Sequence, residues 1–326
     1  MSKPRVFVTR RILERGLNLV QDFCEAEVWP DELPPNREEI LKHVVGVDGL
    51  LCLLTDRIDA EVMDAAGSRL KVISNHAVGV DNVEVAAATA RGIPVGNTPD
   101  ILTDATADMA FALLLAAARR VVEGAWLVKA GGWKTWGPGF MLGADLTGAT
   151  LGIVGFGRIG RAVAHRASGF GMRILFTDPL PDLPEPGVTA EQVDFDSLLQ
   201  ESDFISLHTP LTDQTRGLID ASALKQMKPT AVLVNTSRGP VVDQEALFAA
   251  LKSRQIFAAA LDVTVPEPLP VDHPLLGLEN CIIVPHIASA SWRTRQNMSS
   301  MAAENLIAGL KGERLPHCVN PAVYKE

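Results

Sequence analysis

The middle of the chain contains the run Leu151-Gly152-Ile153-Val154-Gly155-Phe156-Gly157-Arg158-Ile159-Gly160. Its first four residues predict a short buried strand, and residues 161–167 have the spacing of a helix. The glycines between them stand at the first, third and sixth positions of the turn that opens a dinucleotide-binding unit. The first permits a tight turn, the second lets the backbone approach a pyrophosphate, and the third allows the helix to pack closely on the strand. We therefore predict that a dinucleotide binds with its phosphates at the amino end of this helix, on Gly155, Gly157 and Gly160.

An acidic residue follows where ribose recognition requires one. Residues 173–177 predict the next strand, and Asp178 ends it. A carboxylate at this place accepts hydrogen bonds from the adenosine ribose, whereas NADP sites place an arginine nearby for the 2′-phosphate. The chain continues instead with Pro179-Leu180-Pro181. We therefore predict NAD as the cofactor, with NADH preferred over NADPH; the alternative is that Asp178 is only a turn residue before a proline.

Strand and helix patterns alternate along the whole chain, which is typical of α/β proteins with parallel sheets. In the first hundred residues we predict strands at 5–9, 27–29, 50–54, 71–74 and 94–95, with helices at 37–45, 59–66 and 83–91. Beyond the middle we predict strands at 150–154, 173–177, 204–207, 231–235, 258–261 and 281–284. Six strands with intervening helices match a dinucleotide-binding sheet. The chain therefore contains two doubly wound units.

The 326 residues are enough for two domains at roughly 150 residues each. A long helical stretch from about 100 to 130 leads into the second unit, and the apolar face of a last helix, 294–310, fits a return to the first. We predict a discontinuous substrate domain of residues 1–99 and 290–326 around an inserted NAD-binding domain of residues 100–289.

Between the two units lies the stretch Gly131-Gly132-Trp133-Lys134-Thr135-Trp136-Gly137-Pro138-Gly139-Phe140. Glycine and proline prevent regular structure here, while the aromatic side chains need a surface that buries them. Two explanations stay open at this point. The stretch is either an ordered loop folded on its own domain or an arm that holds a second subunit.

Composition excludes several classes of function. The formal net charge is −9, and such a surface repels nucleic acid and anionic lipid. The most apolar run, 109–118, is far shorter than the roughly 20 residues of a membrane span. The four cysteines form no Cys-x-x-Cys pair, and no histidine stands at metal-ligand spacing. We expect reduced thiols, no metal, no nucleic-acid or membrane partner and a cytoplasmic protein.

Three chemically suitable residues lie just beyond predicted strands of the second unit: Arg238, Glu267 and His286. Ligands of open α/β sheets bind outside the carboxyl ends of the strands, so these residues are expected on one rim. Arginine clamps a substrate carboxylate, and a histidine paired with a carboxylate is held protonated and donates to a forming alkoxide. The cofactor supplies the hydride. Together they suit the reduction of a 2-oxo acid.

Each residue alone has a plainer explanation. An arginine at a strand end is more often a surface ion pair, and a glutamate between prolines is more often a solvated turn. His286 also has two rivals at strand ends, His76 and His208. The expected placement of Arg238, Glu267 and His286 together on one rim of the sheet favours a catalytic site over these separate explanations.

Longer stretches around these residues carry a resemblance. They are Val234-Asn235-Thr236-Ser237-Arg238-Gly239-Pro240-Val241-Val242-Asp243, Leu261-Asp262-Val263 with Glu267, and Pro285-His286-Ile287-Ala288-Ser289-Ala290. They resemble the signatures of the D-isomer-specific 2-hydroxyacid dehydrogenases, and the match covers nearly the whole chain. Within that family the chain is most similar to the glyoxylate/hydroxypyruvate reductases, on the runs 97–107, 131–136, 268–270, 273–275 and 293–295.

The resemblance implies a Rossmann cofactor domain inserted into a flavodoxin-like substrate domain, and it implies roles for single residues. Arg238 would hold the substrate carboxylate, with His286 as proton donor and Glu267 as its partner. Backbone N–H groups of Val78 and Gly79 would meet the same carboxylate, and the pocket would also be lined by Ser289. The remaining cofactor contacts would be Thr106, Arg158, Ile159, Asp178, Thr209, Pro210, Thr236 and Asp262.

Members of the family are typically homodimers, which favours the arm. In some relatives an aromatic residue there reaches the partner's active site, and Phe140 occupies that position. The chain also departs from the family pattern. Ala288 replaces a common glycine, and Trp292 either narrows the pocket or packs beneath it. His76 is either a pocket residue or, more plainly, a loop side chain bonded to backbone.

The expected function is therefore NADH-dependent reduction of glyoxylate and hydroxypyruvate to glycolate and D-glycerate. Alternatives within the class are reductases or dehydrogenases of other D-2-hydroxy acids. Glu267 argues against a formate dehydrogenase, and a phosphoglycerate dehydrogenase would need a basic cluster that the sequence does not display. A non-enzymatic NAD-binding interaction protein, such as a transcriptional corepressor of this fold, is the alternative from another class.

Overall fold

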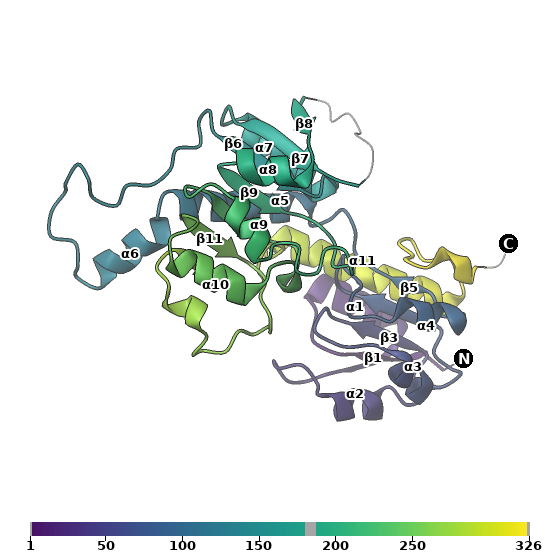
Figure 1. Cartoon of the computed structure of the whole chain (residues 1–326). Helices are drawn as coiled ribbons and strands as arrows, with labels where there is room; N and C mark the ends of the chain where they lie inside the picture. Colours follow the sequence, from purple (N-terminus) through teal and green to yellow (C-terminus); the bar gives the residue numbers. More distant parts are fainter. Residues whose placement is uncertain (1, 180–186, 325–326) are drawn as a thin grey trace. The chain divides into compact units, whose positions relative to one another are not determined.

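The computed structural model describes residues 2–179 and 187–324, and the chain divides into two compact units (Figure 1). The first unit combines Met1–Leu102 with Ala290–Glu326, and the second is Thr103–Ser289. Residues 100–102, assigned above to the second domain, belong to the first unit, because the helix that opens the second unit, α5 (Thr103–Ala118), begins only at Thr103.

The first unit is built on a parallel sheet, which has five strands within the described residues. Their order across the sheet is β2-β1-β3-β4-β5, as in flavodoxin-like folds. The prediction of this fold is confirmed, and each predicted strand overlaps an observed one. The observed bounds are β1 (Arg5–Val8), β2 (Glu25–Val28), β3 (Gly49–Cys52), β4 (Val72–Asn75) and β5 (Val95–Gly96).

Helices cover this sheet, and three lie where the sequence pattern predicts helices: α2 (Arg37–His43), α3 (Ala60–Ala66) and α4 (Val85–Ala90). A further helix, α1 (Glu14–Phe23), was not predicted. Its buried positions Gly16, Leu17 and Val20 have helical spacing, but the segment also contains Gly16 and Asn18, residues of low helix propensity.

The C-terminal helix, α11 (Trp292–Lys311), packs on α1 and on the first sheet. The backbones approach closely, since a Cβ on Gly16 would lie 2.1 Å from the carbonyl oxygen of Ser299. The Ser74 hydroxyl of β4 also donates to the carbonyl of Ala302 at 2.8 Å. These contacts tie the end of the chain to its beginning.

The second unit also contains a parallel sheet, and the described residues contribute seven strands to it in the order β12-β11-β10-β9-β6-β7-β8. The Rossmann order 3-2-1-4-5-6 is present, with one more strand after the sixth. The predicted number of six was wrong. The missed strand is β8 (Ala190–Gln192), a short edge strand with two exposed polar residues and no hydrophobic alternation. The others are β6 (Thr150–Val154), β7 (Arg173–Thr177), β9 (Phe204–Leu207), β10 (Val232–Asn235), β11 (Ala258–Leu261) and β12 (Cys281–Ile283).

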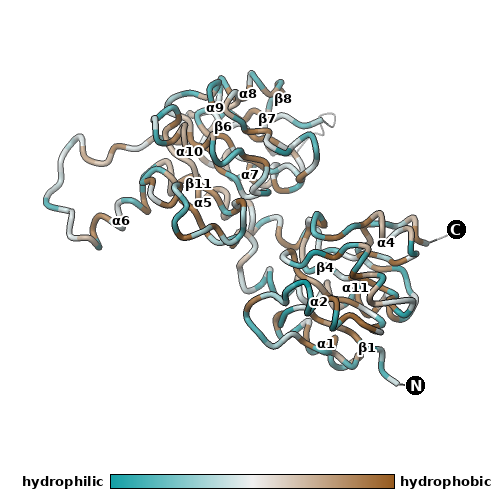
Figure 2. The backbone as a smooth tube through the Cα atoms, turned by 60° about the horizontal axis from the view of Figure 1, so that its bottom comes forward, coloured by the Kyte–Doolittle hydropathy of each residue, from teal (hydrophilic) through white to brown (hydrophobic). Residues whose placement is uncertain are grey.

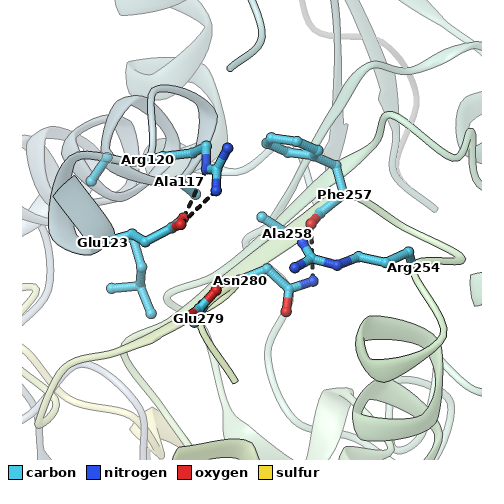
Figure 3. A pocket seen from close by; sticks show the side chains of 10 residues that line it. Ala117, Arg120, Glu123, Arg254, Phe257, Ala258, Glu279 and Asn280 are labelled. Atoms are coloured by element: carbon cyan, nitrogen blue, oxygen red, sulfur yellow. Dashed lines mark hydrogen bonds and ion pairs between the residues drawn. The ribbon is translucent and has the colours of Figure 1, made fainter. Parts of the chain in front are cut away.

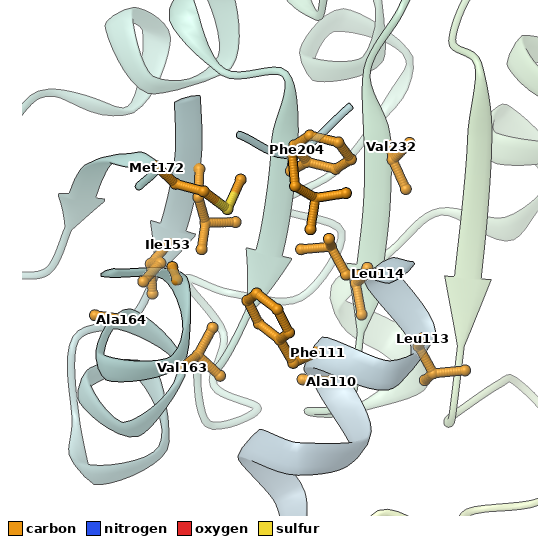
Figure 4. Close-up of a cluster of buried hydrophobic side chains, with 14 of the residues drawn as sticks. Ala110, Phe111, Leu113, Leu114, Ile153, Val163, Ala164, Met172, Phe204 and Val232 are labelled. Atoms are coloured by element: carbon orange, nitrogen blue, oxygen red, sulfur yellow. The ribbon is translucent and has the colours of Figure 1, made fainter. Parts of the chain in front are cut away.

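Alternate residues of the central strands enter different hydrophobic clusters on the two faces of this sheet. Val232 and Val234 of β10 join the side chains of α5 and of α7 (Arg158–Ser168), as Figure 4 shows for part of this cluster. Leu233 joins the cluster on the other face. The helices of that face are α8 (Phe195–Glu201), α9 (Ala221–Gln226) and α10 (Gln244–Lys252). Strands buried on both faces explain the continuous apolar runs of the sequence.

The predicted helix from 100 to 130 is two helices. After α5 the backbone of Arg120 takes a left-handed conformation, with φ 53°, and α6 (Val121–Lys129) begins. The Arg120 guanidinium bonds to Glu123 in the first turn of α6, at 2.8 Å through Nε, which holds the new direction. Helical spacing on both sides of this single residue hid the break.

Helix α6 and residues 130–142 form an arm on the second unit. None of the residues of α6 is buried, and the tube there is partly brown, the colour of hydrophobic residues, in Figure 2. Trp126 is 69% exposed and Trp136 is 77% exposed. The loop is therefore not folded onto its own unit, so the first of the two explanations above is wrong for this structure.

No helix in the described part of the chain is long and apolar enough to span a membrane.

Candidate functional site

The glycine turn between β6 and α7 has the geometry that the motif predicts. Gly155 has φ +91°, a conformation that side chains other than glycine rarely adopt. A Cβ on Gly160 would lie 2.2 Å from the carbonyl oxygen of Gly155, so only glycine allows α7 to pack this closely. A Cβ on Gly157 would project into open space, with no atom within 4 Å. The turn thus leaves a cradle above Gly157, at the amino end of α7.

Asp178 lies directly beside this turn. It follows β7, which pairs in parallel with β6, and its Oδ2 atom accepts a hydrogen bond from the backbone N–H of Phe156 at 2.7 Å. The rings of Phe156 and Phe176 stack with centroids 4.0 Å apart. The acid that was predicted to meet the ribose therefore stands at the rim of the cradle.

The strands on the other side of β6 add polar groups to the same edge. Thr209 and Pro210 follow β9, and Thr236 follows β10. The hydroxyl oxygens of Thr209 and Thr236 are buried and have no hydrogen-bond partner among the described residues. Buried hydroxyls without partners are unusual and point to a ligand that completes them.

These observations test whether a dinucleotide fits. The open space above Gly157 and the unsatisfied hydroxyls both suit a ligand with phosphate and hydroxyl groups. The first turn of α7 contains Arg158 and Ile159 and no acidic residue, so nothing there repels an anion. Thr106 is buried in the first half of α5. The residues present fit a nicotinamide dinucleotide.

Arg238 is presented by a loop that the Asn235 side chain holds together. The Asn235 amide donates to the carbonyl of Arg238 at 2.9 Å, and its oxygen accepts from the backbone N–H of Ser237 at 3.0 Å. The loop packs against a neighbouring one, because a Cβ on Gly239 would lie 2.1 Å from the carbonyl oxygen of Thr264. In the sequence Asn235 stands out only as part of a motif, and this role was not predicted.

His286 and Glu267 form a pair, with 2.8 Å between Nδ1 of the imidazole and Oε2 of the carboxylate. The other oxygen, Oε1, accepts the backbone N–H of Thr264 at 3.0 Å. Burial alone would raise the pKa of Glu267. The hydrogen bond and charge of His286, the Thr264 N–H and the charge of Arg238 together lower that pKa below its ordinary value. The structure thus brings Arg238, Glu267 and His286 to one place.

Asp262 fixes the segment that carries the histidine. Its two carboxylate oxygens accept hydrogen bonds from the backbone N–H groups of Ile287 at 2.6 Å and Ala288 at 2.8 Å. Its backbone carbonyl accepts a hydrogen bond from the N–H of His286 at 2.9 Å. Burial raises the pKa of this carboxyl, and the two amide hydrogen bonds oppose the shift. His286 itself has φ 52°, a strained conformation of the kind found at functional sites. The side chain of Asp262 therefore faces the backbone of residues 286–288.

The first unit holds its own predicted contacts in a loop after β4. The Asn97 side chain donates to the carbonyl of Val78 at 2.8 Å, and Asn75 donates to that of Gly79 at 2.9 Å. Both carbonyl groups therefore point toward side chains of the first unit, and these hydrogen bonds fix the orientation of the peptide group between Val78 and Gly79. Val78 and Gly79 thus belong to the first unit, and Ser289 is the last residue of the second.

A small cavity at the opposite edge of the second sheet is a poor candidate (Figure 3). It is lined by residues at the amino ends of β11 and β12, including Ala258 and Asn280, and holds only about 20 Å³. The Arg120–Glu123 ion pair also lies in its wall. Ligands of parallel sheets bind at the carboxyl ends of the strands, where Arg238, Asp262 and His286 are found.

Within the described residues no group of three or more His, Cys, Asp or Glu side chains is placed to hold a metal ion.

Comparison with known proteins agrees with this geometry. Residues 111–288 match the family model described as D-isomer specific 2-hydroxyacid dehydrogenase, NAD binding domain. A glyoxylate reductase of Korarchaeum cryptofilum (strain OPF8) is 55% identical over 326 residues, which cover 99% of this chain and 98% of that protein.

Solved structures are similar over the same length. The crystal structure of the TT0316 protein from Thermus thermophilus has a TM-score of 0.91 at 50% identity, with 97% of this chain and 99% of that chain covered. An NADPH-dependent glyoxylate/hydroxypyruvate reductase from Sinorhizobium meliloti, solved with NADP and malonate, has a TM-score of 0.84 at 31% identity. There the coverage is 100% of this chain and 99% of that chain.

Proposed function

The chain belongs to the D-isomer specific 2-hydroxyacid dehydrogenase family and is an oxidoreductase, and from this premise we propose that it reduces glyoxylate and hydroxypyruvate to glycolate and D-glycerate. The observation that carries the proposal is the His286–Glu267 pair, held at 2.8 Å on the unit that bears the glycine turn. A histidine paired with a carboxylate serves as a proton donor, and this reaction needs a proton on the carbonyl oxygen.

Each residue has a defined part in the reaction. The guanidinium of Arg238 and the backbone N–H groups of Val78 and Gly79 hold the substrate carboxylate, while Ser289 lines the same pocket. Glu267 binds the Nδ1 side of His286, so the opposite nitrogen, Nε2, delivers the proton to the carbonyl oxygen. The bound nicotinamide supplies the hydride. Asp262 keeps the His286 segment in place through its amide hydrogen bonds.

The two units have separate tasks in this proposal. The second unit, Thr103–Ser289, binds NAD, through the glycine turn and through Thr106, Arg158, Ile159, Asp178, Thr209, Pro210 and Thr236. The first unit, Met1–Leu102 with Ala290–Glu326, forms the substrate domain. The open space at Gly157 and the unsatisfied hydroxyls of Thr209 and Thr236 support the first assignment.

We propose NADH as the preferred cofactor because of Asp178. Its carboxylate stands beside the glycine turn and repels a 2′-phosphate. The Sinorhizobium meliloti relative is NADPH-dependent, so similarity to this family does not by itself decide the cofactor of this chain. The residue at this position therefore has to be tested directly.

The arm suits a homodimer. The exposed apolar side chains of α6 and of residues 130–142 need a partner surface, and a second copy of this chain is the partner proposed here. Phe140, 45% exposed, is then available to the partner's active site.

The test is the initial rate of glyoxylate and of hydroxypyruvate reduction, with NADH and NADPH run side by side. We expect turnover of both acids and a higher kcat/KM with NADH. A preference for NADPH would overturn the role of Asp178 alone. No turnover of either acid with either cofactor would overturn the proposed function.

A further inference from the structure

The first unit contains a cavity of about 370 Å³ that the reduction of glyoxylate does not require. Arg11, which lies between β1 and α1, and His76, which follows β4, line it together with Arg295 and Ser299 of α11. The remaining wall is mostly apolar and includes Leu53 and Trp292. Trp292 is 81% exposed, so it borders the cavity rather than packing beneath it.

The charge of the cavity wall is positive. Two arginines line it, and none of the described residues around it is acidic. Burial and the neighbouring charge of Arg295 lower the pKa of His76 to about 4, so that imidazole is neutral near pH 7. The wall also includes the N-cap of the long helix α11, whose amino end favours negative charge.

A hydrogen-bond network makes the wall well defined. Nε2 of His76 lies 3.1 Å from the Ser299 hydroxyl oxygen, which also accepts the backbone N–H of Leu13 at 3.2 Å. The Ser299 hydroxyl donates to the carbonyl of Arg295 at 2.9 Å. These bonds join the loop before α1, the loop after β4 and the first turns of α11. His76 is therefore held by a side chain and lines the cavity.

The cavity adjoins the loop that is proposed to hold the substrate carboxylate. His76 precedes Val78 by two residues, so their Cα atoms are at most about 7 Å apart. A 2-oxo acid of about four or five carbons covers such a separation. Glyoxylate has no carbon beyond its aldehyde carbon and is too short to cover this separation.

We propose that this cavity is a second anion subsite, which binds the negatively charged far end of a 2-oxo acid through Arg11 and Arg295. The substrate class is thereby extended to 2-oxo acids with a second anionic group, either a carboxylate or a phosphate. The inference rests on the proposed function. The reaction is unchanged: the C2 carbonyl gains two electrons and one proton as the hydride that NADH would supply, and a second proton from His286, which solvent protonates again; one NADH becomes one NAD⁺.

The two arginines, Arg11 and Arg295, come from opposite ends of the sequence. The packing of α11 on α1 and on the first sheet places them in one wall. This pair of basic residues is therefore not displayed as a cluster in the sequence.

The experiment compares kcat/KM for 2-oxo acids with and without a second anionic group. The pairs are 2-oxoglutarate with 2-oxohexanoate, and 3-phosphohydroxypyruvate with hydroxypyruvate. We expect at least one acid with the second anionic group to exceed its partner by about tenfold or more, as a charge-assisted contact does. The pair that shows the preference identifies the anionic group as carboxylate or phosphate.

Variants assign the preference to the cavity. Arg11→Met and Arg295→Met should each reduce the preference for the anionic acid while the kcat/KM for glyoxylate stays near the wild-type value. Arg295→Lys, which keeps the positive charge, should retain part of the preference for the acid with the second anionic group. The matched control is Arg293→Met, on the same helix but outside the cavity wall, and it should change neither quantity.

The outcomes separate the two proposals. Reduction of glyoxylate without preference for any anionic acid, or a preference that survives both Arg→Met variants, would overturn the subsite and leave the proposed function intact. Failure to reduce any 2-oxo acid would overturn the proposed function itself.

Discussion

At the scale of single residues, the candidate site consists of reactive side chains and of neighbours that fix them. Arg238, Glu267 and His286 were predicted because their residue types suit the chemistry and each follows a strand. Their neighbours were not predicted for this purpose. Asn235 and Thr264 each bond to a residue of their own loop, and these contacts depend on the backbone conformation of the loop, for which residue type alone carried no signal.

The lowered pKa of Glu267 gives a prediction of pH dependence. Its ordinary value of 4.5 is lowered in the fold, so the ionised carboxylate stabilises the protein above that value and this stabilisation is lost as the pH falls through the lower, folded pKa. At neutral pH the group is charged and binds Nδ1 of His286. In Glu267→Gln we expect kcat/KM for glyoxylate to be reduced about tenfold or more, and the loss of activity that accompanies protonation of Glu267 at acidic pH to be absent, because the variant has no carboxylate to protonate.

The pH profile is measured beside thermal unfolding of the same variant. A profile identical to that of the wild type would contradict the role of Glu267.

The contacts of Asp262 lead to a prediction that distinguishes positioning of the His286 segment from direct contact with the cofactor. Both of its oxygens accept backbone N–H groups, so Asp262→Asn loses one of these bonds, at a cost of about 1–3 kcal/mol. We expect kcat to fall while the Kd for NADH, measured by fluorescence titration, stays the same. A weaker Kd with kcat unchanged would instead make Asp262 a direct cofactor contact.

At the scale of elements, most strands were predictable because strands buried on both faces leave apolar runs in the sequence. The failures have physical causes. Helix α1 contains Gly16 and Asn18, which have low helix propensity, and β8 lies at an edge and is polar. The break between α5 and α6 depends on one residue, Arg120, whose left-handed backbone leaves the helical spacing on either side unchanged.

The glycine turn permits a prediction with a built-in control. In Gly157→Ala the new methyl group meets no protein atom, so we expect normal thermal stability with NADH binding weakened about tenfold or more, since the methyl group fills the phosphate cradle. In Gly160→Ala the Cβ meets the Gly155 carbonyl at 2.2 Å, so we expect a lower Tm as well. Calorimetry and NADH titration of both variants check this. Unchanged NADH affinity in Gly157→Ala would remove the dinucleotide from this turn.

At the scale of the whole molecule, the exposed apolar arm is the feature that a single chain leaves unexplained. Its composition was visible in the sequence, but only the structure shows that Trp126, Trp133 and Trp136 are exposed on their own unit. The surface that covers these tryptophans therefore depends on how copies of the chain assemble.

We expect the protein to sediment as a dimer at micromolar concentration. The double variant Trp133→Ser/Trp136→Ser should shift it to monomer, because it removes the largest apolar side chains of the loop. Circular dichroism of the variant should stay unchanged, since both residues are exposed. A monomeric wild-type protein, or a variant that remains dimeric, would contradict the arm as a dimer contact.

The central claim is that His286 delivers the proton in a reduction whose cofactor is bound elsewhere on the same unit. The most direct measurement compares wild type with His286→Gln in two assays, glyoxylate turnover with NADH and the Kd for NADH. We expect kcat to fall by about 10²- to 10⁴-fold in the variant while the Kd for NADH does not change. Unchanged turnover in the variant would contradict it.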